Sequence, residues 1–238
     1  MTTRFSGSVA LVTGGTGGLG RAVSLAFLKE GASVIATYIK KDEADALRDA
    51  VGTNAHLELL PLDATNEDAC RNLVDGITAR YGHLDVLVNA IGGYAGGKSL
   101  WETDPKTYKL MSMTNTDAGF TLARVVVPAM LKRSSGAIVN IAAKAAFDHA
   151  AGASAYAASK SAALALFDCM AQDLKGTGVR VNSILPSIID TEANRKAMPS
   201  ADFSKWPKPE EIARVILFLC SPDAAVVHGA AIPVYGQS

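Results

Sequence analysis

The stretch Thr13-Gly14-Gly15-Thr16-Gly17-Gly18-Leu19-Gly20 decides the fold of this chain. An apolar run at 8–12 precedes it, and an amphipathic stretch at 19–30, ended by Gly31, follows it. This pattern predicts a strand, a turn and a helix in succession. Because glycine has no β-carbon, the backbone N–H groups of the turn and the helix N-terminus can approach a pyrophosphate closely. The G-x-G-x-x-G spacing in this context predicts a dinucleotide site.

Outward from this turn, short apolar strands alternate with longer amphipathic helices to the end of the chain. The further strands are predicted at 33–38, 56–60, 84–89, 137–141, 179–185 and 231–234, and the further helices at 42–51, 66–81, 104–132, 152–175 and 209–219. Such alternation is typical of an α/β doubly wound parallel sheet, a Rossmann fold with helices on both faces. No linker or repeat interrupts the pattern, so we expect residues 1–238 to form a single domain.

Two segments depart from this regular pattern. Pro128 lies near the end of the predicted helix 104–132, where it should bend or break the last turns. Residues 187–208 form an irregular stretch that is too long for a plain strand-to-helix connection. Long connections of this kind are usually lids or binding loops. We therefore expect a substrate lid at 187–208.

Composition and charge exclude several classes of function. The formal net charge is +0 and the charged fraction is 19%, which does not fit a nucleic-acid-binding surface. No apolar run is long enough to span a membrane, and no secretory signal precedes the first strand. The cysteines, Cys70, Cys169 and Cys220, show no metal-ligand spacing. We expect a cytoplasmic protein with a small-molecule substrate and no metal site.

The end of the second predicted strand bears on the choice between NAD and NADP. An acidic residue at this place normally binds the ribose 2′-hydroxyl of NAD. Here Tyr38 occupies the place, followed by Ile39, Lys40 and Lys41. The two lysines can neutralise the 2′-phosphate of NADP, or they can be solvated charges at the start of a surface helix. The sequence leans towards NADP and leaves NAD open.

A tyrosine and a lysine mark the candidate catalytic centre. Tyr156 and Lys160 are four residues apart in a predicted helix, so both lie on the same face. A neighbouring ammonium stabilises phenolate, which lowers the tyrosine pKa and makes the phenol a usable general acid. The pair predicts proton transfer to a substrate during hydride chemistry.

Together with the glycine-rich turn, this pair makes the chain resemble the short-chain dehydrogenase/reductase family over nearly its whole length. Further marks are Asp63, Asn89-Ala90-Ile91-Gly92, Asn115 and residues 186–191. The resemblance implies that Asp63 and Ala64 lie beside the adenine. Asn89 would support the nicotinamide, whose carboxamide Ile189 and Thr191 would anchor. The turn chemistry and the resemblance together give a cofactor site of Gly14, Gly15, Thr16, Gly17, Gly18, Leu19, Gly20, Tyr38, Lys40, Asp63, Ala64, Asn89, Ala90, Tyr156, Lys160, Pro186, Ile189 and Thr191.

The resemblance also implies roles for three catalytic residues. Lys160 would hold the hydroxyls of the nicotinamide ribose while polarising Tyr156. Asn115 would kink its helix and hold a water of the proton relay that runs through Lys160. Family members are usually dimers or tetramers, so the resemblance implies a homodimer or homotetramer formed through the helices at 104–132 and 152–175.

One family residue is missing. Ala143 occupies the position where the family carries a catalytic serine, whose hydroxyl binds the substrate oxygen. Losing such a donor can cost about 2.7–4 kcal/mol of transition-state stabilisation. The dihydropteridine reductase subgroup lacks this serine as a rule, and the chain resembles it at 143–148, 92–97 and 190–206. That subgroup has an acidic residue where this chain has Tyr38.

These features lead to one leading hypothesis and two alternatives. The leading hypothesis is NAD(P)H-dependent reduction of a quinonoid dihydropterin or a similar electron-poor heterocycle, which needs a flat slot and a proton source more than an oxyanion donor. The first alternative is a carbonyl or 3-oxoacyl reductase that lacks the usual serine. The second is a catalytically inactive nucleotide-binding protein, against which the intact Tyr156 and Lys160 argue. The expected substrate residues are Tyr94, Ala143, Lys144, Asn194 and Trp206.

Overall fold

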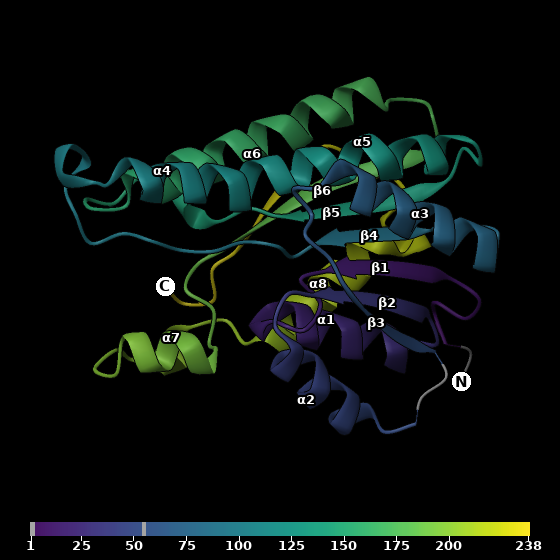
Figure 1. Cartoon of the computed structure of the whole chain (residues 1–238), viewed down its shortest axis with the longest axis horizontal. Coiled ribbons are helices and arrows are strands. Elements are labelled where there is room, and N and C mark those ends of the chain that lie inside the picture. The colour runs from purple at the N-terminus through teal and green to yellow at the C-terminus, as the bar shows by residue number, and fades with distance from the viewer. Residues whose placement is uncertain (1–2, 54–55) are drawn as a thin grey trace.

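A computed structural model describes residues 3–53 and 56–238 and contains one seven-stranded parallel sheet (Figure 1). The strand order is β3-β2-β1-β4-β5-β6-β7, which confirms the doubly wound topology predicted from the sequence. The order reverses between β1 and β4, and in such sheets ligands bind outside the carboxyl ends of the strands at this point. The strands are β1 (Val9–Thr13), β2 (Ser33–Tyr38), β3 (Leu57–Pro61), β4 (Val86–Asn89), β5 (Gly136–Ile141), β6 (Val179–Pro186) and β7 (Ala231–Val234).

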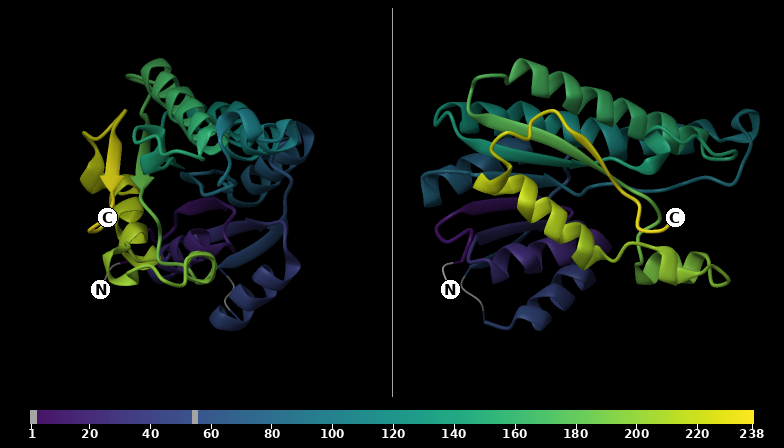
Figure 2. Two further views of the ribbon diagram at one scale, coloured as in Figure 1. Left: turned by 90° about the vertical axis from the view of Figure 1, so that its left-hand side faces the viewer. Right: turned by 180° about the vertical axis from the view of Figure 1, so that it is seen from behind.

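Helices cover both faces of the sheet. One face carries α3, α5 and α6, and the other carries α1 and α8, which lie side by side in Figures 1 and 2. Within the described residues, no helix has the length and apolar character that a membrane crossing requires. The α-helices are α1 (Gly18–Lys29), α2 (Lys41–Val51), α3 (Glu67–Tyr81), α4 (Pro105–Ser112), α5 (Ala118–Leu131), α6 (Ser154–Asp173), α7 (Glu192–Ala197) and α8 (Pro209–Cys220).

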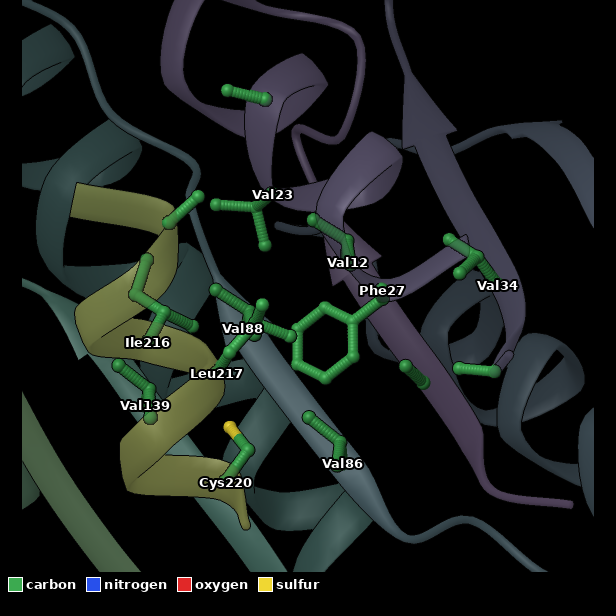
Figure 3. Packing of buried hydrophobic residues seen from close by; sticks show 14 of the residues in the cluster. Val12, Val23, Phe27, Val34, Val86, Val88, Val139, Ile216, Leu217 and Cys220 are labelled. Carbon is green, nitrogen blue, oxygen red and sulfur yellow. The ribbon is translucent and has the colours of Figure 1, made fainter. Parts of the chain in front are cut away.

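The core between α1, α8 and the sheet surrounds Phe27. This side chain is 0% exposed and lies over the strands, with Leu217 and Cys220 of α8 nearby (Figure 3). Its ring contacts Phe5 edge to face, with 4.9 Å between the ring centroids. Burying an aromatic side chain of this size stabilises the fold by about 1.5–3 kcal/mol. The apolar runs that predicted the strands are buried because helices cover both sides of the sheet.

The predicted helix 104–132 is divided in the structure. A π-helical turn, Met113–Asp117, separates α4 from α5, so the interruption lies at Asn115. Pro128 does not end the helix, because α5 continues to Leu131. The stretch 187–208 is less irregular than expected, since it contains α7 and a 3-10 turn, Phe203–Lys205. In Figure 1, α7 stands apart from the sheet on the side where the strands end.

Candidate active site

The glycine-rich turn is held against the end of β2. Gly14 N donates to Thr37 Oγ1 at 3.2 Å, and Gly15 N donates to Thr37 O at 2.9 Å. Gly14 has a φ of +66°, which favours glycine. A β-carbon on Gly20 would lie 2.0 Å from Gly14 O, so helix α1 begins in direct contact with the turn. The sequence predicted this turn correctly, because the need for glycine is local.

The start of α1 fits a dinucleotide pyrophosphate. Its N-cap residue, Gly17, makes no side-chain cap hydrogen bond, and the first turn of the helix contains no acidic residue. A β-carbon on Gly17 would have only Gly14 O, at 3.6 Å, within 4 Å, so the outer side of the turn is open. The free N–H groups and the positive end of the helix dipole therefore face a space that suits phosphate oxygens.

A carboxylate that the sequence did not single out lies beside this turn. Glu43, in the first turn of α2, accepts a hydrogen bond from Thr16 Oγ1 at 3.3 Å. Its other oxygen accepts from Lys40 Nζ at 3.0 Å. Lys40 is therefore paired with a carboxylate, which raises the pKa of its ammonium. Lys41 pairs with Asp45 at 2.5 Å, farther along the same helix.

The predicted cofactor residues after β3 and β4 lie in the loops that follow these strands. Ala64 is buried and Asp63 is exposed, with Asp63 Oδ1 accepting from the backbone N–H and the hydroxyl of Thr65, which lowers the pKa of its carboxyl. Asn89 ends β4 and is buried, accepting from Thr13 Oγ1 at 3.2 Å. Ala90 N donates to Thr13 O at 3.0 Å. Both loops thus open at the carboxyl edge of the sheet.

Lys160 and Asn115 converge on the segment that follows β4. A β-carbon on Gly92 would lie 3.0 Å from Lys160 Nζ and 3.1 Å from Asn115 Oδ1. Asn115 Oδ1 accepts from Gly93 N, and its Nδ2 donates to Gly93 O, both at 3.0 Å. The π-helical turn positions this side chain, since π-bulges change the direction of helical residues and are frequent at functional sites. Lys160 Nζ donates to Ile141 O at 2.8 Å.

The protonation of the Tyr–Lys pair differs from the expectation. Burial, with a smaller contribution from Tyr94, raises the pKa of Tyr156 to about 12 rather than lowering it. Burial also lowers the pKa of Lys160 to about 8. The reason is that desolvation outweighs charge stabilisation, and the Lys160 ammonium is directed at the carbonyl of Ile141. The phenol is therefore fully protonated near neutral pH.

Tyr94 packs against Tyr156, the predicted catalytic tyrosine. Its ring meets the Tyr156 ring edge to face, with 5.0 Å between centroids, and 67% of Tyr94 remains exposed. The edge-to-face arrangement is a favourable aromatic geometry. Tyr94 thus contacts the Tyr156 ring and leaves most of its own ring exposed to solvent.

The segment after β5 lacks a hydroxyl at the serine position. Ala143 is 6% exposed in extended backbone, and its methyl group cannot donate a hydrogen bond. The next residue, Lys144, is half-buried, with its Nζ 3.5 Å from Asp148 and 5.3 Å from the centroid of the Tyr235 ring. Lys144 is thus a cation held near the position of the missing serine.

The stretch 187–208 meets the cofactor site through Thr191. A β-carbon on Gly18 would lie 2.8 Å from Thr191 Cγ2, so these residues are in contact distance of each other. Thr191 also caps α7 by accepting from Asn194 N, and Asn194 Nδ2 donates to Ile189 O at 2.8 Å. Asn194 therefore binds the backbone of the same stretch, 187–208. Trp206 is 7% exposed and packs against Phe203, with 4.9 Å between centroids, in the manner of a packing residue.

Sequence reasoning missed several residues that organise the site. Ser159 Oγ accepts from Asn115 Nδ2 at 3.0 Å and donates to Tyr156 O at 2.7 Å, which links the π-helical turn to α6. Tyr235 contributes the ring beneath Lys144. Tyr235 is far from Lys144 along the chain, so the sequence contains no local sign of this contact. Ser159 directly precedes Lys160, and that position could have pointed to it.

Thiols and metal ligands contribute nothing to this site. Cys70 and Cys220 are buried, and burial raises their thiol pKa values to about 11 and about 12. Cys169 is exposed on α6. In the part of the chain that the structure describes, no three His, Cys, Asp or Glu side chains are grouped to hold a metal ion.

Comparisons with known proteins agree with this geometry. Residues 8–202 match the short chain dehydrogenase family. A 3-oxoacyl-[acyl-carrier-protein] reductase, FabG, of Thermotoga maritima is 33% identical over 98% of both chains. A 7alpha-hydroxysteroid dehydrogenase of Escherichia coli is 31% identical over 98% of this chain and 94% of its own. The solved structure of ElxO with NADP bound superposes with a TM-score of 0.90 at 26% identity, covering 96% of this chain and 97% of that one. The chain belongs to the short-chain dehydrogenase family, whose members bind NAD(P), and is an oxidoreductase.

Proposed function

We propose that this protein catalyses NAD(P)H-dependent reduction of a carbonyl compound, with Tyr156 as the proton donor. The observation that carries the proposal is the convergence of the Lys160 and Asn115 side chains at Gly92. Lys160 lies one helical turn from Tyr156 in α6. The names of the relatives support it, since they describe a 3-oxoacyl reductase and a hydroxysteroid dehydrogenase. An inactive nucleotide-binding protein would have no need of this arrangement.

Each residue has a distinct role in the proposed reaction. The bound nicotinamide supplies the hydride, and the protein supplies the proton and the orientation. Tyr156, protonated because burial raises its pKa to about 12, donates its phenolic proton to the substrate oxygen. Lys160 would hold the nicotinamide ribose and would replace the proton that Tyr156 gives up. Asn115 fixes the backbone of Gly93, next to Gly92, on which the Lys160 ammonium also converges.

Ala143 restricts the substrates that this site can reduce. Without the serine hydroxyl, the developing alkoxide loses a donor worth about 2.7–4 kcal/mol, which corresponds to about 10²–10³-fold in rate. Carbonyl groups that are already electron-poor, such as those conjugated or flanked by a second carbonyl, need this donor least. We therefore propose activated carbonyl compounds as the preferred class over simple ketones.

A second candidate is the reduction of a quinonoid dihydropterin or a similar electron-poor heterocycle. The specific observations in its favour are the methyl group of Ala143 and the exposed ring of Tyr94 beside Tyr156. A flat heterocycle can stack on Tyr94, with about 0.5–1.5 kcal/mol beyond the burial of its surface. The conjugated imine accepts hydride readily and does not depend on an oxyanion donor.

The oligomeric state is also a proposal. Large apolar side chains are exposed on α4, on the π-helical turn and on α5, namely Tyr108, Leu110, Met113 and Phe120. We propose that these helices pair with another copy of the chain, as a homodimer or homotetramer. Light scattering coupled to size exclusion measures the mass and tests this.

The experiment compares NADH and NADPH oxidation with quinonoid dihydropterin, an activated dicarbonyl and a simple ketone. The variants are wild type, Ala143→Ser and a matched control, Ala142→Ser, which adds a hydroxyl to the preceding buried residue. We expect turnover of the dicarbonyl, slow simple-ketone reduction, and a rise of about 10-fold or more in ketone rate in Ala143→Ser alone.

The outcomes separate the candidates. Turnover of dihydropterin that exceeds that of every carbonyl compound would favour the second candidate and reject the first. An equal rise in both serine variants would show that Ala143 does not occupy the donor position. The absence of turnover with all three substrates, despite nucleotide binding, would contradict both candidates.

A further inference from the structure

The carboxylate of Glu43 occupies the place between the glycine-rich turn and the end of β2. Its oxygens accept from Thr16 Oγ1, which belongs to the turn, and from Lys40 Nζ, which follows the strand. The turn and the strand are fixed to each other by the two hydrogen bonds from Gly14 and Gly15 to Thr37. The position of Glu43 is thus determined by a buried residue of the turn, since Thr16 is 6% exposed.

This position is where the adenosine ribose of a dinucleotide is recognised. In sheets of this kind, an acidic residue near the end of the second strand accepts a hydrogen bond from the ribose 2′-hydroxyl. The strand itself ends in Tyr38 and has no carboxylate to offer. Glu43 reaches the same place from the first turn of α2, five residues later in the chain.

We propose that Glu43 binds the ribose 2′-hydroxyl and makes the protein selective for NAD(H) over NADP(H). The inference rests on the proposed function, because it assumes that the site binds a nicotinamide dinucleotide. A 2′-phosphate carries about −1.5 to −2 charges near neutral pH and would be repelled by the carboxylate. Lys40, which the sequence offers as a phosphate ligand, is neutralised by Glu43, and Lys41 is paired with Asp45.

The ion pairs of Lys40 and Lys41 argue against the preference for NADP that the sequence indicates. Two lysines after Tyr38 look like a phosphate site when only their order along the chain is known. In the structure, each ammonium has a carboxylate partner on α2 within 3.0 Å. In this pair Glu43 Oε1 faces Lys40, whereas Oε2 is directed at Thr16 of the glycine-rich turn. With 35% of its side chain exposed, Glu43 can still accept a hydrogen bond from the ribose.

Direct binding measurements test the assignment without depending on turnover. Dissociation constants for NADH and NADPH are measured by calorimetry for wild type, Glu43→Gln, Lys40→Gln and the control Asp42→Asn. Asp42 is on the same turn of α2, so its replacement removes one negative charge but leaves the hydrogen bond to Thr16. We expect wild type to bind NADH at least about 10-fold more tightly than NADPH, since hydrogen bonds to charged groups are worth roughly that ratio.

Glu43→Gln should reduce this preference by about 10-fold or more, and Asp42→Asn should leave it within about 2-fold of wild type. Lys40→Gln should not weaken NADPH binding. A wild type that prefers NADPH, or an NADPH affinity that falls in Lys40→Gln, would overturn the proposal. If Glu43→Gln keeps the wild-type preference for NADH, the proposal is also overturned, because Glu43 is then not the residue that selects NAD(H). If neither dinucleotide binds, the proposed function fails and the present inference fails with it.

Discussion

At the scale of single residues, burial shifts the pKa values of the proposed catalytic pair, Tyr156 and Lys160, in opposite directions. It raises the pKa of Tyr156 to about 12 and lowers that of Lys160 to about 8. Tyr156 therefore keeps its proton across the physiological range, as a proton donor for reduction must. Lys160 is the group whose charge changes near neutral pH. Reduction should consequently weaken as the pH rises through about 8, because the lysine then loses the proton that it would relay.

The buried ammonium also predicts how stability depends on pH. The pKa of Lys160 is about 8 when folded against a usual value of 10.5, so between these values the unfolded chain binds more protons than the folded one. Stability should therefore rise with pH in this window, by up to about 1.4 kcal/mol per pH unit from this group. Urea unfolding of wild type and Lys160→Met from pH 7 to 10 gives the difference between their free energies of unfolding. Groups that titrate in both proteins cancel in this difference.

The same series has a clear control. Met130 is a fully buried apolar residue that carries no titratable group, so the difference between wild type and Met130→Leu should stay flat from pH 7 to 10. We expect Lys160→Met to be more stable than wild type at pH 7, to lose this advantage towards pH 10, and to have no reductase activity. A difference in unfolding free energy between wild type and Lys160→Met that does not change with pH would contradict the lowered pKa of Lys160.

At the scale of elements, the sequence predicted what depends on local chemistry. The glycine-rich turn and all seven strands were predictable, because apolar runs and the spacing of glycines can be read from neighbouring residues of the sequence. The division of the helix at 104–132 was not readable from its periodicity. The π-helical turn there is stabilised by contacts of Asn115 with Gly93 and Ser159, which lie 22 and 44 residues away. For the same reason the carboxylate of Glu43, held by Thr16, was missed.

Two glycines inside helices provide a prediction at this scale. Replacing a helical glycine by alanine usually stabilises a protein by about 0.5–1 kcal/mol. Gly76 in α3 has no atom within 4 Å of an added β-carbon, so Gly76→Ala should show this gain in urea unfolding. Gly20 in α1 would place the β-carbon 2.0 Å from Gly14 O, which is backbone and cannot turn away.

Gly20→Ala should therefore lose about 1–3 kcal/mol despite the better helix propensity of alanine. Because the displaced atoms belong to the glycine-rich turn, which is expected to bind the pyrophosphate, NADH affinity should fall as well, as measured by calorimetry. Gly76→Ala should keep the NADH affinity of wild type. Equal stability changes in the two variants would mean that α1 and the turn are not in contact as described.

At the scale of the whole molecule, the active site depends on residues from both ends of the sequence. The last residues return to the stretch 187–208, which we propose is a lid: Ser187 Oγ donates to Tyr235 O at 2.7 Å, and Gln237 N donates to Lys205 O at 2.9 Å. The lid in turn touches the first turn of the protein, through Thr191 and Gly18. The glycine-rich turn, the lid and the C-terminal segment thus form one continuous set of contacts at the carboxyl edge of the sheet.

Gly236 tests whether this C-terminal contact holds the lid. It has a φ of +64°, and a β-carbon there would lie 2.8 Å from Lys205 O and 3.0 Å from Pro207 N, both in the lid. Gly82 has a φ of +78° with no atom within 4 Å of a β-carbon, so Gly82→Ala is a control with backbone strain alone. That strain costs roughly 1–2 kcal/mol in either variant. We expect only Gly236→Ala to raise the substrate KM and to speed proteolytic cleavage within 187–208, because only its methyl group displaces the lid. Matching KM values in the two variants would instead show that the C-terminal segment merely packs beside the lid, and that substrate closure depends on Thr191 and the cofactor site.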